Sequence, residues 1–180
     1  MSLRFAILTA LSERSATGSE LARRFDRSIG YFWPASHQQI YRELDRLSDD
    51  GLIVEVETDE PAGRGQPRTF DVTDDGTTAL AGWLAEDSPS PPVRDAMLVR
   101  LRAAAVLGRA DDVVPVLRGR LAQHEQNLVT YEGFEQRDFP GEVSDPADVL
   151  RRQILRSGIE LERLWIRWCR ETLAALGERV

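Results

Sequence analysis

The sequence has one cysteine and no lysine. Cys169 stands alone among 180 residues, and all 23 basic residues are arginine. A single cysteine excludes an intramolecular disulfide framework and any metal site built from several cysteines. Nowhere do apolar residues run for the roughly 18 positions that a membrane-spanning helix needs. The first residues are too mixed for a secretory signal and lack a small-residue cleavage site. We therefore expect a cytoplasmic protein with no membrane partner.

The charge of the chain limits what it binds. Its formal net charge is −7 at pH 7, which argues against a protein that binds any polyanion. The positive charge is unusual in kind, because arginine presents a planar fork of donors that fits phosphate groups and guanine edges. Codon bias in a GC-rich genome explains the same excess without any function. The positions of the arginines, rather than their number, must therefore support a functional claim.

Apolar residues at helical spacing predict three short helices near the N-terminus. The first has one apolar face, which comprises Leu3, Ile7, Leu8 and Leu11. Thr17 and Glu20 fit a capping box that begins the second helix. Ser36 and Gln39 repeat this pattern, so the third helix is expected to begin at about His37. The third helix has an apolar stripe of its own, which comprises Ile40, Leu44 and Leu47.

A β-hairpin is expected after the third helix. Residues 52–57 alternate in part between apolar and polar side chains, and residues 69–72 alternate again. The stretch between them, residues 59–67, is rich in turn-forming residues. A further helix is expected to open at Thr73. Helix, helix, helix, hairpin and helix in this order are typical of a winged helix-turn-helix domain, which we place at residues 1–86.

A proline-rich linker separates this domain from the rest. Residues 87–92 contain three prolines within four positions, which stop a helix and stiffen the chain. Residues 93–180 then have a helical pattern throughout. The first of these helices is marked by Val93, Met97, Leu101 and Ala105. The predicted fold class is mainly α with a small β-hairpin: a winged helix-turn-helix domain followed by a helical dimerisation domain.

The last helix is expected to begin after Asp145 and to run to about Leu176. Its apolar residues cover more than one face: Leu150, Ile154, Leu155, Ile159, Leu161, Leu164, Trp165, Ile166, Trp168 and Leu173. A second copy of the chain would bury the excess, and a two-fold homodimer is the commonest way to do so. We assign four of these residues to a dimer interface or an effector pocket: Ile154, Leu161, Trp165 and Trp168. The two tryptophans form either dimer core or the wall of a pocket for a flat aromatic effector.

The third helix carries polar side chains on its outward side, near its N-terminus. They are Ser36, His37, Gln38, Gln39, Arg42 and Arg46. Glutamine both donates to and accepts from adenine, arginine matches guanine or phosphate, and the N-terminal end of a helix favours a phosphate. An ordinary solvated helix with a good cap would carry similar residues. The two preceding helices and the hairpin favour the interpretation that these residues bind DNA.

Two arginines lie at the predicted wing. Arg64 stands between two glycines and Arg68 follows Pro67. Glycine lets the backbone approach a surface closely, and an arginine at a wing tip fits a narrow minor groove. The alternative is a flexible turn with a solubilising arginine. Asp59 and Glu60 at the start of the loop oppose the approach of DNA.

The sequence contains no recognisable catalytic motif. A nucleophile elbow, a phosphate-binding loop, an HExxH pattern and a paired-carboxylate site are all missing. His37 and His124 are too few for a metal site, so we expect His37 to contact DNA or phosphate and His124 to lie at the surface. Cys169 is expected to be a small buried apolar residue. We therefore expect neither enzymatic activity nor a cofactor.

Over its whole length the chain resembles the PadR family of bacterial transcriptional regulators. Four segments carry the resemblance: ELARRF (20–25), GYFWPASHQQIYRELDRL (30–47), DGLI (50–53) and RTFDVTDDG (68–76). The polar run that leads into Tyr41, Arg42, Glu43 and Leu44 is the most specific of these. The C-terminal part is similar to the longer, multi-helix form of the family's dimerisation domain.

The resemblance implies a homodimeric winged helix repressor that inserts its third helix into successive major grooves of a pseudo-palindromic operator in double-stranded DNA. By position, Gln38, Gln39, Tyr41 and Arg42 would contact DNA from the third helix. Arg64 and Arg68 would contact it from the wing. A small aromatic or drug-like effector, bound near the dimer interface, would release the DNA, and the operator-bound protein would be associated with the nucleoid.

Two other classes of function compete with this hypothesis. In the first, the winged helix is a protein-interaction module, and the acidic charge of the chain steers it to a basic partner. A small-molecule binding protein without any DNA function would use the third helix only as a scaffold. Retention of specific DNA fragments by the purified protein separates the first hypothesis from the other two.

Overall fold

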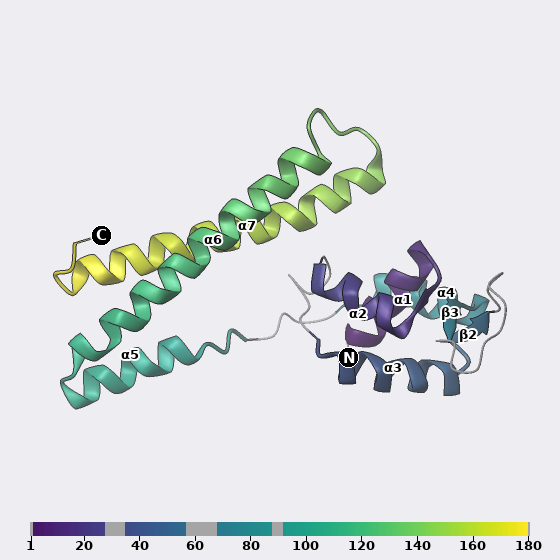
Figure 1. Cartoon of the computed structure of the whole chain (residues 1–180), viewed down its shortest axis with the longest axis horizontal. Helices are drawn as coiled ribbons and strands as arrows, with labels where there is room; N and C mark the ends of the chain where they lie inside the picture. Colours follow the sequence, from purple (N-terminus) through teal and green to yellow (C-terminus); the bar gives the residue numbers. More distant parts are fainter. Residues whose placement is uncertain (1, 28–34, 57–67, 88–91, 180) are drawn as a thin grey trace. The chain divides into compact units, whose positions relative to one another are not determined.

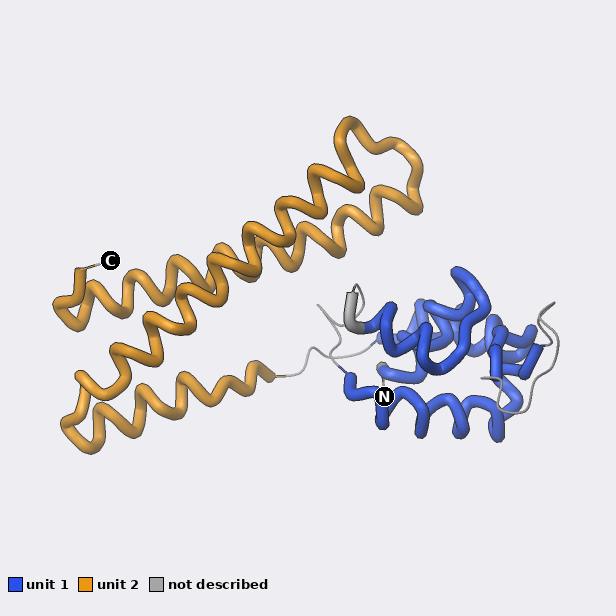
Figure 2. The backbone as a smooth tube through the Cα atoms, viewed as in Figure 1, with its two compact units in different colours: residues 1–90 blue, residues 91–180 orange. Residues whose placement is uncertain are grey.

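The computed structural model describes the chain in four stretches: residues 2–27, 35–56, 68–87 and 92–179. The chain forms two compact units, residues 1–90 and residues 91–180 (Figure 2). The division falls inside the proline-rich stretch of residues 87–92. Each unit has its own group of buried apolar side chains, and the two are described separately.

The first unit has the element order that the sequence predicts for a winged helix. In chain order its elements are α1 (Ser2–Glu13), β1 (Ala16–Thr17), α2 (Gly18–Arg27), α3 (His37–Asp49), β2 (Ile53–Val56), β3 (Thr69–Val72) and α4 (Asp74–Leu84) (Figure 1). Strands β2 and β3 are the two arms of the expected hairpin. The predicted fold class, mainly α with a small β-hairpin, is confirmed.

The sheet has one more strand than expected. Strand β3 lies in the centre and pairs antiparallel with β2, so that Ile53 stands opposite Val72. On its other edge β3 pairs antiparallel with β1, where Ala16 stands opposite Phe70. The sequence predicted only the hairpin, so strand β1 was missed. A strand of two residues is too short to show the alternation by which strands are recognised.

Side-chain caps fix where two of the helices begin. At α2, the Thr17 hydroxyl accepts a hydrogen bond from the Glu20 N–H (3.2 Å), and the Glu20 carboxylate accepts one from the Thr17 N–H (2.8 Å). The hydrogen bond from the Thr17 backbone is the main reason that the pKa of Glu20 is lowered. Ser36 and Gln39 form the same arrangement at α3. Both predicted capping boxes are confirmed.

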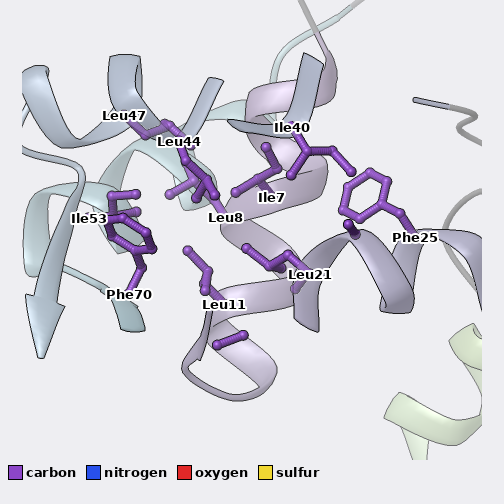
Figure 3. Close-up of a cluster of buried hydrophobic side chains, with 13 residues drawn as sticks. Ile7, Leu8, Leu11, Leu21, Phe25, Ile40, Leu44, Leu47, Ile53 and Phe70 are labelled. Carbon is purple, nitrogen blue, oxygen red and sulfur yellow. The ribbon is translucent and has the colours of Figure 1, made fainter. Parts of the chain in front are cut away.

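Helices α1, α2 and α3 and strands β2 and β3 enclose the core of the first unit. Figure 3 shows the buried side chains of these elements pointing toward one another, among them Ile7 and Leu8 of α1 and Phe25 of α2. Helix α3 contributes Ile40, Leu44 and Leu47, all three fully buried as predicted. Burial of one such side chain contributes about 1.5–3 kcal/mol. The three together are therefore enough to hold α3 in one rotational setting.

The second unit is helical throughout its described residues. It contains α5 (Ala96–Leu107), the 3₁₀ helix η2 (Ala110–Val113), α6 (Val114–Asp138) and α7 (Pro146–Ala175). Helices α6 and α7 lie side by side (Figure 1). The α7 bounds agree with the prediction, and Asp145 caps the helix by accepting hydrogen bonds from two backbone N–H groups. No helix in the described part of the chain is long and apolar enough to cross a membrane.

The apolar face predicted for α5 was partly wrong. Val93 precedes the helix and is exposed, and Ala104, rather than Ala105, is buried. Met97 is buried as expected, and Leu101 packs against the same core. The helix begins at Ala96 because Asp95 caps it. Val93, the first residue of the predicted apolar face, therefore lies before the helix.

Two glycines of α4 give opposite predictions for stability. A Cβ atom at Gly76 would lie 2.1 Å from the carbonyl oxygen of Leu52, whereas a Cβ atom at Gly82 would meet nothing within 4 Å. We expect Gly76→Ala to lower the free energy of unfolding by about 1–3 kcal/mol, because a backbone oxygen cannot easily move aside. Gly82→Ala should raise it by up to about 1 kcal/mol, because alanine favours the helix.

Urea unfolding of both variants, followed by circular dichroism, measures the difference. The two substitutions add the same methyl group to the same helix, so Gly82→Ala is the matched control. Equal stability of the two variants would contradict the close packing of Gly76 on Leu52.

Candidate DNA-binding interface and helical unit

The outward side of α3 carries a stripe of polar residues opposite the buried one. Gln38, Arg42, Asp45 and Asp49 are exposed, and at 100° per residue they lie within roughly 60° of one another around the helix. Within the described part of the chain, no hydrogen bond or ion pair engages the side chain of Gln38 or Arg42. These two side chains are therefore available to a ligand that approaches α3.

Ser36 and Gln39 already have structural roles at the start of α3. The Ser36 hydroxyl accepts a hydrogen bond from the Gln39 N–H (3.3 Å), and Gln39 Oε1 accepts one from the Ser36 N–H (2.8 Å). Gln39 as a residue is nevertheless exposed. That Ser36, Gln39 and the neighbouring His37 contact DNA stays a prediction.

Tyr41 packs against the beginning of α2. A Cβ atom at Gly18 would lie 2.3 Å from Cε1 of the Tyr41 ring, so the ring rests directly on the glycine. The tyrosine is nevertheless about half exposed, with 47 % of its surface accessible. The sequence pattern gave no sign that Gly18 and Tyr41 meet. Their contact joins the outward side of α3 to the N-terminal end of α2.

Arg24 of α2 forms hydrogen bonds to the C-terminal end of α1. Its guanidinium donates hydrogen bonds to the backbone carbonyls of Ala10 (2.9 Å) and Arg14 (3.0 Å) at the C-terminal end of α1. A cation at this end of a helix satisfies carbonyl groups that have no partner within the helix. This arginine therefore has a structural role in setting the angle between the two helices.

Two of the other arginines predicted to bind DNA, Arg46 and Arg68, are paired with acids. Arg46 lies beside Glu43 on α3, with 3.2 Å between the guanidinium and the carboxylate. Arg68, at the start of the β3 arm, donates to Asp45 of α3 over 3.2 Å. Its guanidinium also lies 5.3 Å from the centre of the Phe70 ring. Arg64 lies outside the described residues, as do the aromatic residues 31–33 and Pro34 before α3.

Helix α7 has two apolar sides, as its composition predicted. One side is buried within the unit: Ile159, Glu162, Ile166, Cys169 and Leu173. The other side exposes Leu150, Ile154, Leu161 and Leu164. The exposed set, together with Trp168, recurs at intervals of three, four or seven residues, which is the spacing of a coiled-coil seam. Of the four residues assigned to an interface or pocket, Ile154 and Leu161 lie on this exposed stripe.

Trp165 and Trp168 pack largely within their own unit. The guanidinium of Arg120 lies 4.6 Å from the centre of the Trp165 ring, and the His124 ring is stacked on it at 6.1 Å. Trp168 meets Trp165 edge-on at 5.5 Å. Two side chains of α6 therefore already cover Trp165. The expectation that His124 lies at the surface was wrong, because its side chain is only 15 % exposed.

A polar network under Trp165 connects α5, α6 and α7. Asp95 receives two hydrogen bonds from Arg120 (2.8 and 2.5 Å), which are the main cause of its lowered pKa. Arg120 Nε in turn donates to His124 Nε2 (3.2 Å), so the imidazole proton lies on Nδ1 and is donated to Glu162. Asn127 gives Glu162 a second hydrogen bond (3.2 Å). Glu162, a charged side chain buried among apolar ones, is thereby satisfied.

Cys169 lies at the edge of this network and is fully buried, as predicted. Burial raises the pKa of its thiol, so the reactive thiolate form is disfavoured. A shallow hollow of about 340 Å³ lies elsewhere on the unit, lined by Leu128, Arg163, Ile166, Arg167, Arg170 and Glu171. None of the four residues assigned to the interface or pocket lines it. Among the described residues there is no cluster of side chains suited to a metal ion.

Taken together, the exposed stripe of α3, the hairpin beside it and a separate helical unit define a winged helix-turn-helix regulator with a C-terminal helical extension. Family comparison gives the same division. Residues 7–82 match the transcriptional regulator PadR-like family, and residues 93–177 match the family described as virulence activator alpha C-term. The chain belongs to the PadR-like family of transcriptional regulators. Its members regulate transcription and are not enzymes.

Relatives align with the chain over almost its whole length. A probable transcriptional regulator of Mycobacterium tuberculosis, Rv1176c, is 38% identical and covers 99% of this chain and 100% of its own. The structure of the Vibrio cholerae virulence activator AphA is 33% identical, with a TM-score of 0.80 and 98% of both chains covered. Bacillus subtilis PadR in complex with operator DNA is 26% identical, with a TM-score of 0.81, covering 97% of this chain and 99% of its own.

Proposed function

We propose that the protein is a sequence-specific DNA-binding regulator that reads an operator with the outward stripe of α3. The observation that carries the proposal is the anchoring of α3: three buried side chains fix the helix, and Gln38 and Arg42 face away from the core without partners in the described structure. Glutamine and arginine are the side chains best suited to adenine and guanine edges in the major groove. Bacillus subtilis PadR, which has the same fold, binds operator DNA.

The wing completes the proposed interface. Arg68 directly precedes β3 and pairs with Asp45 of α3, and Arg64 lies in the sequence between β2 and β3. Ser36, His37, Gln39, Tyr41 and Arg46 form the surroundings of the reading residues. The backbone N–H groups at the start of α3 favour a phosphate at this end. A winged helix module that binds a protein partner would use the same exposed side chains, so retention of DNA by the purified protein distinguishes the two.

We further propose that two copies bind a pseudo-palindromic operator. The exposed stripe of α7 repeats at coiled-coil spacing, and a second copy would cover it. Such a dimer presents two α3 helices to two half-sites, and half-sites one helical turn apart match two-fold symmetry. Ile154, Leu161 and Trp168 are the residues proposed for this interface. Bound to its operator, the protein would be found with the nucleoid in the cytoplasm.

The proposed effect on transcription is repression, relieved by a small aromatic effector. Bacillus subtilis PadR, 28% identical over 97% of both chains, is a negative transcriptional regulator. It also binds p-coumaric acid, in a structure whose TM-score is 0.80. The proposed effector site is the neighbourhood of Trp165 and Trp168, where Arg120 supplies a cation near aromatic rings. AphA, a virulence activator, shares the fold. Expression from a promoter fusion, measured with and without the protein, therefore decides between repression and activation.

The central prediction concerns DNA. Selection of random duplexes by the purified protein should yield one enriched sequence, and binding to it should weaken steeply with salt. Gln38→Ala and Arg42→Ala should each weaken binding to this sequence by about 1–3 kcal/mol, because each removes a contact to a base edge. Fluorescence anisotropy with a labelled duplex measures the affinities.

The control for this experiment is Arg102→Ala, which removes the same charge from an exposed position on α5. Its binding should stay close to that of the unchanged protein. Selection that enriches no sequence at low salt would exclude the proposed function. A pull-down that yields one stoichiometric protein and no DNA would instead support the interaction module.

The dimer is tested separately. We expect light scattering at micromolar concentration to give twice the mass of the chain. Replacing Ile154 and Leu161 by glutamate should give a folded monomer, because charges would enter the seam between the copies. Leu84→Glu, on an exposed apolar residue of α4, should leave the dimer intact. A monomer mass for the unchanged protein, or a dimer that survives both glutamates, would contradict the proposed interface.

The effector is tested with p-coumaric acid as the probe. Titration into the operator complex should lower the bound fraction and quench tryptophan fluorescence, because the ring would bind in the neighbourhood of Trp165 and Trp168. Hexanoic acid, which carries the same charge without a ring, is the control. Release by both acids would show an effect of charge alone, and release by neither would exclude this effector while leaving DNA binding untouched.

A further inference from the structure

The middle of the proposed reading stripe holds an acid. Asp45 lies between Arg42 and Asp49 on the outward side of α3, and it accepts a hydrogen bond from Arg68 over 3.2 Å. Both side chains are largely open to solvent, Asp45 at 62% and Arg68 at 57% of their side-chain surface. An exposed pair of this kind contributes only about 0.2–1 kcal/mol, so a competing partner can readily separate it.

Asp45 is placed to meet a base. It lies seven positions after Gln38, which is about 10 Å further along the helix at 1.5 Å per residue. This length corresponds to roughly three base pairs at 3.4 Å each. A carboxylate in the major groove accepts a hydrogen bond from the N4 amino group of cytosine, but it finds no donor at guanine N7 or O6 or at thymine O4. Adenine N6 also donates, but the acceptor N7 beside it disfavours a carboxylate, so cytosine is the preferred partner.

Arg68 is placed to meet a phosphate. Its guanidinium lies 5.3 Å from the centre of the Phe70 ring and also pairs with Asp45. A backbone phosphate offers the guanidinium a pair of acceptor oxygens and one negative charge, as a carboxylate does. DNA that approaches α3 therefore brings a competitor for Arg68 and, at the same time, leaves Asp45 in need of another donor.

We propose that Asp45 is a specificity-determining residue that exchanges Arg68 for the amino group of a cytosine in the operator. In the free protein Asp45 is paired with Arg68. In the operator complex Arg68 turns to a phosphate and Asp45 accepts from cytosine N4. On other sequences Asp45 either retains Arg68, which costs a phosphate contact, or stands unpaired next to DNA. The inference rests on the proposed function, because it requires α3 to enter the major groove.

The test compares Asp45→Ala with Asp49→Ala. Asp49 lies on the same stripe one turn further along, is exposed, and has no ion pair within the described structure, so the two variants lose the same charge from the same helix face. Affinities are measured by anisotropy for the selected operator duplex and for a mixed-sequence duplex of equal length. Asp45→Ala should lower the ratio of these affinities roughly tenfold, the discrimination expected from one base contact. Asp49→Ala should change both affinities by a similar factor and leave the ratio as it is.

Two further readouts separate base reading from a general charge effect. Selection of random duplexes with Asp45→Ala should lose the preference for C·G at one position of each half-site and keep the others. On mixed-sequence DNA, Asp45→Ala should steepen the salt dependence by about 0.9 in log–log slope, because Arg68 gains a phosphate. This steepening should vanish when Arg68→Ala is added to the variant.

Equal affinity ratios for the two alanine variants would overturn the proposal, as would an unchanged selection profile. A steepening that persists without Arg68 would also overturn it, because Asp45 would then act by charge alone. If the unchanged protein enriches no DNA, the proposed function fails first. If the unchanged protein enriches an operator but the two alanine variants have equal affinity ratios, only the proposed role of Asp45 is excluded.

Discussion

The arrangement of the proposed interface depends on the burial of one side of α3. Ile40, Leu44 and Leu47 are inserted into a core supplied by α1, α2 and the sheet, and this fixes the rotation of the helix about its axis (Figure 3). Without that rotation the outward residues would have no defined direction. The cap at Ser36 and the stop at Gly51, whose φ is 72°, then fix the two ends. The few polar side chains on the outward side of α3 keep a defined direction because the apolar packing beneath them permits only one rotation of the helix.

The arginines of the second unit serve its own fold more than any ligand. Arg152, Arg163 and Arg170 of α7 each pair with a glutamate of α6. These exposed or half-buried pairs set the register of two long helices rather than contributing much free energy. The buried network from Asp95 to Glu162 has a different effect. A charge left without its partner in that position would be costly, so the network selects one arrangement of the three helices. The apolar stripe of α7 thereby remains turned outward.

Much of the fold follows from local sequence patterns. The capping boxes, the leucines of α3 and the length of α7 were all predictable, because each is set by residues within a turn or two of one another. Strand β1 was missed because its pairing with β3 depends on residues more than fifty positions away. The same reason accounts for His124, whose partners Glu162 and Trp165 lie on α7, and for the pair of Asp45 with Arg68. The candidate reading residues were predictable as a set, but their division into capping, packed, paired and unpartnered side chains required the tertiary structure.

The contact between Gly18 and Tyr41 has an evolutionary consequence. Any side chain at position 18 would displace the tyrosine ring from the start of α2, and the ring, as the end of a side chain, would swing outward rather than break the fold. Drift at position 18 would therefore be tolerated by the core and felt at the surface that we propose for DNA. We expect the two positions to covary among relatives, with glycine accompanying a large ring and bulkier residues accompanying a smaller one. A substitution at position 18 would thus act on the proposed DNA surface through the Tyr41 ring.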